Sequence, residues 1–190
     1  YLKGWGGDRN KFRDFAIKMD FEPAADNYHK IDCPTVFRQG DKWLMTYVVY
    51  NGKGGTDGRG YETWIAESDN LLEWRTLGRV LSYRDGKWDC NQRGGFPALP
   101  DMEWGGSYEL QTYKGRHWMT YIGGEGTGYE AVKAPLYVGL AWTKGDISTA
   151  HEWESLDKPI LSIHDKDAQW WEKLTQYKST VYWDKDKTLG

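Results

Sequence analysis

Hydrophobic positions along the chain fall into short runs of β-type residues, such as TVFRQ at 35–39 and YETWIAES at 61–68. Gly, Asp and Asn residues separate these runs, and long stretches with helical periodicity are scarce. Short runs of this kind between turn residues are typical of β-strands joined by tight turns. The pattern therefore predicts an all-β fold.

The pattern also repeats along the chain. The run WLMTY at 43–47 recurs as HWMTY at 117–121, a shift of roughly 75 residues. A further strand follows each copy, YETWIAES and LYVGLAWT, and a Glu-Trp pair comes after each strand. Four strands per unit at this spacing describe a blade of a β-propeller better than a sandwich. The alternative is a chance similarity between two β meanders.

A third unit begins near the end of the sequence, where TVY at 180–182 echoes TVF at 35–37. We therefore expect a lead-in over 1–30, blades over 31–81 and 82–161, and the start of a further blade over 177–190. About two and a half blades cannot close a ring, and open blades leave strand edges unpaired. We expect the chain to be an N-terminal fragment, completed by blades outside it.

Composition and charge exclude several classes of function. The 28 acidic and 25 basic residues are mixed and leave a net charge of −3, which makes binding through nucleic-acid phosphates a poor fit. No apolar stretch is long enough to span a membrane. The 12 Trp and 13 Tyr residues suit half-buried strands and sugar-stacking surfaces alike, because each has an apolar body and a polar tip.

Motif searches remove further chemistry. The chain has no nucleophile-elbow, dinucleotide-binding or P-loop motif. Its histidines are scattered, and no spacing is typical of a zinc site. Cys33 and Cys90 are the two cysteines. They are compatible with a disulfide or with two free thiols.

The stretch DCPTVFRQGDKWLMTY at 32–47 resembles the inner-strand signature of five-bladed β-propeller glycoside hydrolases, the superfamily of families 43, 32 and 130. The stretch WIAESDNLLEW at 64–74 is similar to the third strand and following turn of the same enzymes. The resemblance covers most of residues 28–190 and implies catalytic carboxylates at a central funnel. It also implies a secreted or periplasmic protein.

The resemblance implies a role for four acidic residues. Asp32 matches the general-base Asp of family 43, with Cys33 inserted before the proline; the alternative is an Asp that only caps a turn. The second inner strand is expected in SYELQTYKG, where Glu109 stands in place of the family's Asp. The acid and pKa-tuning roles are shared among the remaining candidates, Glu109, Asp89 and Glu172. The third strand has no Glu at the family's position.

Candidate substrate-binding residues are those that can stack on a sugar, hold a hydroxyl or bind an anion: His29, Trp88, Arg93, Trp104, Tyr177 and Lys178. Lys178 occupies the expected position of the third-blade Glu. An ammonium group there can hold a sugar hydroxyl, a substrate carboxylate or inorganic phosphate. For the cations the alternative is a surface salt bridge, and for the tryptophans it is core packing.

These observations predict a glycosidase that acts on an oligosaccharide or polysaccharide. The alternatives are a propeller that only binds carbohydrate, or a phosphorylase resembling family 130. We expect a carbohydrate partner, no nucleic acid, no membrane-spanning segment and no cofactor. Some relatives hold a structural calcium ion near the propeller axis, but no ligand set for it can be assigned in this sequence.

Overall fold

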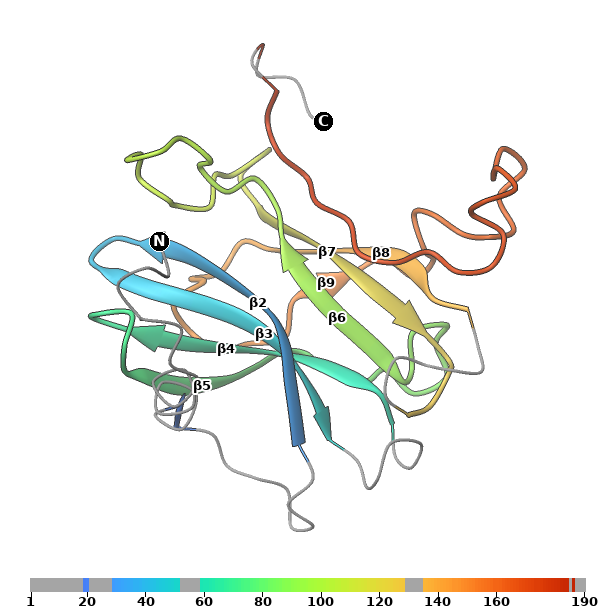
Figure 1. Ribbon diagram of the computed structural model, residues 1–190, viewed down its shortest axis with the longest axis horizontal. Helices are drawn as coiled ribbons and strands as arrows, with labels where there is room; N and C mark the ends of the chain where they lie inside the picture. Colours follow the sequence, from blue (N-terminus) through green and yellow to red (C-terminus); the bar gives the residue numbers. More distant parts are fainter. Residues whose placement is uncertain (1–18, 21–28, 52–58, 129–134, 185, 187–190) are drawn as a thin grey trace, which may run out of the picture.

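The structure is a computed structural model that describes residues 19–20, 29–51, 59–128, 135–184 and 186. The two longest strands open the first sheet, and the second sheet is built from shorter ones (Figure 1). The strands are β1 (Met19–Asp20), β2 (His29–Gln39), β3 (Lys42–Asn51), β4 (Tyr61–Ser68), β5 (Trp74–Leu81), β6 (Gln92–Pro97), β7 (His117–Gly124), β8 (Tyr137–Thr143) and β9 (Glu154–Ser155). The all-β prediction is confirmed for the described residues, which contain no helix that could cross a bilayer.

The strands form two antiparallel meanders. The first sheet has the order β1-β5-β4-β3-β2, in which β1 pairs in parallel with β5, and the second has the order β6-β7-β8-β9. Strands that follow one another in sequence are neighbours in space, so tight turns suffice to connect most of them. Both sheets place their first long strand, β2 or β6, at an edge. The blade boundaries expected from the sequence stay a prediction.

The turn between β4 and β5 shows how local sequence shapes these meanders. The Ser68 hydroxyl accepts hydrogen bonds from the N–H groups of Asn70 and Leu71 at 3.2 and 2.9 Å. The Asn70 side chain in turn accepts from the next two N–H groups. Short polar side chains thus satisfy the backbone where the ladder ends. The Ser-Asp-Asn-Leu stretch is therefore a self-contained turn.

The main hydrophobic core lies between the two sheets. Side chains of the first sheet, among them Phe37 and Ile65, pack against Met119 and Tyr121 of β7. Glycine makes this close packing possible, since a Cβ atom on Gly139 would lie 2.2 Å from the Tyr121 ring. The two sheets consequently form one packed body rather than two independent units.

The position of the second edge strand corrects the sequence-based expectation. The strand paired with β7 is β6 at 92–97, and SYELQTYKG contains no regular strand. Residues after β6 instead leave the sheet and return, with Pro100 bridging to Leu110 and the Gln111 N–H donating to the Leu99 carbonyl. Because β6 already fills the edge of β7, the segment that carries Glu109 is excluded from that position.

Candidate functional site

The two edge strands begin at the same end of the molecule. Tyr50 pairs with Tyr61 in the first sheet, and the Tyr61 N–H donates to the side chain of Gln92, the first residue of β6, at 3.0 Å. The Gly60 N–H also donates to the Asn91 carbonyl at 2.7 Å. Since Tyr50 pairs with Lys30 of β2, the starts of β2 and β6 are held at one end of the two sheets.

Asp32 lies near this common end, at a break in the ladder. The pairing between β2 and β3 shifts register between Asp32 and Thr35, and Cys33 adopts a left-handed backbone with a φ of 51°. The Asp32 carboxylate accepts a hydrogen bond from the Cys33 N–H at 2.7 Å. A bulge with a non-glycine residue at positive φ costs free energy, and such strain concentrates at functional sites.

Lys178 reaches the same place from the last part of the chain. Its segment is tied to the second sheet, where the Gln176 N–H donates to the Leu136 carbonyl at 2.9 Å and the Thr120 hydroxyl donates to the Ser179 carbonyl at 3.1 Å. Lys178 itself has a φ of 38°. Two strained residues, Cys33 and Lys178, therefore meet near the end where the strands begin.

The Lys178 ammonium and the Cys33 side chain are hydrogen-bonded, and this bond raises the pKa of Lys178. The nearby charges of Cys33, Tyr177 and Asp32 raise that pKa further. Burial raises the pKa of the Cys33 thiol, although Lys178 acts in the opposite direction. At neutral pH the pair is thus a neutral thiol beside an ammonium group. We call Asp32, Cys33 and Lys178 the strand-start cluster.

The second sheet supplies no carboxylate at the position equivalent to Asp32. Asp32 pairs with Val48, and the repeat aligns Val48 with Ile122, whose partner in β6 is Gly94. A Cβ atom on Gly94 would lie 3.0 Å from Ile122 and 3.1 Å from Val48. The packing between the sheets therefore selects glycine at this position.

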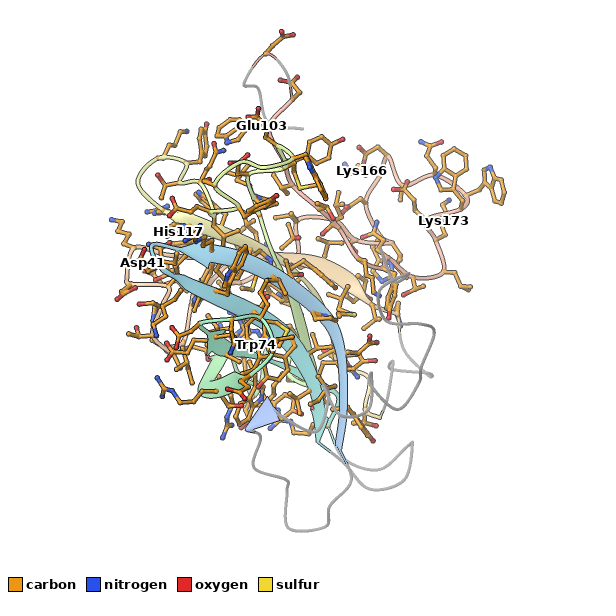
Figure 2. All side chains as sticks on the ribbon, turned by 60° about the vertical axis from the view of Figure 1, so that its left-hand side comes forward. Asp41, Trp74, Glu103, His117, Lys166 and Lys173 are labelled. Atoms are coloured by element: carbon orange, nitrogen blue, oxygen red, sulfur yellow. The ribbon has the colours of Figure 1, made fainter. Side chains whose placement is uncertain are left out.

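Glu109 does not join the strand-start cluster. It forms an isolated parallel bridge with Arg38, and its carboxylate accepts from the Gly40 N–H at 3.1 Å. Gly40 occupies the turn that ends β2, so Asp32 and Glu109 lie on the order of 15 to 20 Å apart along this strand. The excursion that carries Glu109 also carries Glu103, which projects from the body above the Asp41 turn in Figure 2.

Asp89 and Arg93 form a buried polar network between the sheets. The side chains of both residues have 0% exposure, and the Arg93 Nε lies 3.2 Å from an Asp89 carboxylate oxygen. Asp89 also pairs with Arg84 and accepts a hydrogen bond from the Tyr121 hydroxyl at 2.8 Å. Arg93 continues to Glu152 at 2.6 Å. This arrangement holds the two sheets together, and its groups are already engaged with one another.

The remaining candidates are spread over the surface. Trp104 lies exposed in the excursion, while Glu172 accepts from the Gln169 N–H in a turn of the loop after β9. That loop projects from the body and carries Lys166 and Lys173 (Figures 1 and 2). His29 is the first residue of β2, where its backbone pairs with Asn51. Tyr177 is exposed beside Lys178.

Two features of the site were not predicted from the sequence. The first is the strained backbone of Cys33, for which the residue inserted before the proline of a recurring motif is a signal. The second is the contact between Cys33 and Lys178, which has no signal in the sequence. Both cysteines are free, Cys33 and Cys90 alike. Within the described ranges, no group of three or more His, Cys, Asp or Glu side chains could hold a metal ion.

Comparison with solved structures first defines a class. A protein named "Glycoside hydrolase" is 95% identical to this chain, with a TM-score of 0.83, over 87% of this chain and 47% of its own. Zg3597, a family 117 glycoside hydrolase from Zobellia galactanivorans, is 11% identical over 85% of this chain and 47% of its own, with a TM-score of 0.61, and shows the fold alone.

A further structure narrows the comparison to a particular protein. BT0996, in a complex with RGII, is 95% identical over 87% of this chain and 47% of its own, again with a TM-score of 0.83. This chain therefore spans about half the length of these two solved structures. A scan of protein-family models finds no match, and neither does a search of curated proteins.

Proposed function

We propose that the protein is a glycoside hydrolase and that RGII is its substrate. The 95% identity to a protein named as a glycoside hydrolase, over 87% of this chain, carries the proposal. The RGII complex of BT0996 supports the choice of substrate. The two meanders would be the first two blades of a five-bladed propeller, and the segment of Lys178 would begin the third.

The strand-start cluster is the proposed catalytic region. Hydrolysis with inversion needs one ionised carboxylate that activates water and one protonated carboxyl group that donates to the leaving oxygen. Asp32 is suited to the first role, because it lies near the end where β2 and β6 begin and its carboxylate is oriented by the Cys33 N–H. Lys178 would hold a substrate oxygen close to Asp32, since its raised pKa keeps it charged.

The general acid stays a prediction. Among the residues expected to share this role, Asp89 is enclosed in the buried network, Glu109 lies at the far end of β2, and Glu172 occupies a turn. We propose a structural role for Asp89, because its carboxylate already pairs with two guanidinium groups and a hydroxyl.

A second candidate function rests on Lys178. An ammonium group beside the proposed base, together with Gly94 in place of a second carboxylate, is the arrangement that a phosphorylase would use to hold inorganic phosphate as the nucleophile. The same features would also suit a propeller that binds carbohydrate without cleaving it.

One experiment separates these three functions. The whole protein is incubated with RGII, with and without inorganic phosphate, and the released sugars are identified. Product without phosphate supports the hydrolase, and product that requires phosphate supports the phosphorylase. Binding by calorimetry without any product would support the binding module and reject the enzyme.

A further inference from the structure

A cavity at one end of the second sheet is separate from the strand-start cluster. Its volume is about 290 Å³, and its lining includes Trp88, Glu125, Tyr137, Ser162 and His164. Glu125 directly follows β7, Tyr137 opens β8, and Ser162 and His164 come from the loop after β9. The cavity is thus built from segments far apart in the sequence.

Aromatic rings form a fixed wall of this cavity. Trp88 stacks on the buried ring of Tyr121, with centroids 5.7 Å apart and an angle of 17°. Tyr137 meets Trp88 edge-on at 6.1 Å, and the His164 ring lies 6.2 Å from Tyr137. Gly123 makes room for Trp88, because a Cβ atom there would lie 2.7 Å from the indole. The wall is therefore formed before any ligand arrives, which lowers the entropic cost of binding.

The chemistry of the lining matches a sugar ring. Aromatic faces bury the C–H surface of a sugar, while the Glu125 carboxylate, the Ser162 hydroxyl and the His164 ring offer hydrogen bonds to its hydroxyl groups. The volume lies just below the roughly 300 to 1,000 Å³ of pockets for drug-sized ligands, so it suits a single ring. The negative charge of Glu125 favours a neutral sugar over an acidic one.

The cavity and the strand-start cluster share the end of the sheets where β2 and β6 begin. Leu136, beside Tyr137, donates its N–H to the Thr175 hydroxyl at 2.9 Å and accepts from the Gln176 N–H at 2.9 Å, on the segment that leads to Lys178. Leu136 also belongs to the hydrophobic cluster against which Cys33 packs. Because side chains alternate along an extended strand, Tyr137 points away from that cluster and into the cavity.

We propose that this cavity is an outer sugar-binding subsite, which holds a neutral monosaccharide unit of the glycan that the strand-start cluster acts on. The proposal rests on the proposed function for its choice of glycan. It implies that the substrate is an extended or branched oligosaccharide, since one ligand must reach both places. A disaccharide would occupy only one of them.

The test measures binding of RGII by calorimetry in the whole protein with Asp32→Asn, so that no turnover interferes. Replacing Tyr137 by Ala should weaken binding at least tenfold, and Tyr137→Phe, which keeps the ring, should weaken it less than threefold. Because Tyr137 lies in a strand, His164→Ala on the exposed loop gives a second reading and should weaken binding severalfold. Trp170→Ala, an exposed aromatic residue elsewhere on that loop, should leave binding unchanged.

The outcomes distinguish this proposal from the proposed function. If the wild type releases no product but Tyr137→Ala still loses affinity, the subsite stands and the hydrolase assignment is rejected. If the wild type is active and neither Tyr137→Ala nor His164→Ala changes the Kd or KM, the subsite is rejected. Absence of binding to both RGII and a panel of neutral monosaccharides would also reject it.

Discussion

The Lys178 ammonium is hydrogen-bonded to the Cys33 side chain, and both residues hold left-handed backbone conformations. The contact joins the first half of β2 to the last described segment of the chain. Each residue alone would be a local irregularity, but together they bring a cation to the carboxylate of Asp32. Strain stored on both sides of one contact favours a functional role for the cluster.

The first prediction concerns the proposed base. Asp32→Asn keeps an oxygen that can accept from the Cys33 N–H but loses the charge needed to activate water, so kcat should fall by about 10² to 10⁴-fold. Product release from RGII and the thermal midpoint are measured together. Asp41→Asn, in the exposed turn after β2, is the matched control and should retain full activity. Unchanged turnover in Asp32→Asn would reject the assignment.

The second prediction concerns the reactivity of Cys33. Burial raises its thiol pKa, so the thiolate fraction near pH 8 is smaller than that of a free cysteine, whose pKa is about 8.5. Alkylation by iodoacetamide should therefore be severalfold slower than for a model thiol and should accelerate at higher pH. Lys178→Met removes an interaction that lowers this pKa and should slow alkylation further, whereas Lys178→Arg should not. Faster alkylation in Lys178→Met would contradict the contact.

The third prediction concerns the buried network. Arg93→Met leaves Asp89 buried without one of its partners and should lower the free energy of unfolding by about 3 to 5 kcal/mol. Asp69→Asn is the control, because the pair of Lys42 and Asp69 is exposed, at 44% and 77% of the side-chain surface, and should change stability by less than about 1 kcal/mol. Urea denaturation measures both. Equal losses in the two variants would show that the buried network does not hold the sheets together.

The fourth prediction concerns packing between β7 and β8. Gly139→Ala would place a methyl group 2.2 Å from the Tyr121 ring, and this ring is held by the hydrogen bond from its hydroxyl to Asp89. Overpacking of this kind costs about 1 to 3 kcal/mol. The thermal midpoint should fall accordingly, without loss of the β-type circular dichroism spectrum. A variant as stable as the wild type would mean that Tyr121 can move aside.

The sequence pattern predicted the strands better than their partners. The match between 43–47 and 117–121 located β3 and β7, because alternation and turn residues are local properties of the chain. The same pattern assigned the segment of Glu109 to the second edge strand, where β6 stands instead. Strand pairing depends on which segment fits closely against β7. The glycines of β6 fit, since a Cβ atom on Gly95 would lie 2.3 Å from the Met119 sulfur.

By itself the sequence determined an all-β chain with a repeating unit, an interrupted motif at Asp32 and a surplus of aromatic residues, since each follows from the order of residue types. Only the tertiary structure decided that Lys178 meets Cys33, that Asp89 is enclosed by arginines and that Trp88 and Tyr137 wall a cavity. These contacts join segments distant in sequence. They arise from the packing of one sheet against the other, which periodicity along the chain does not encode.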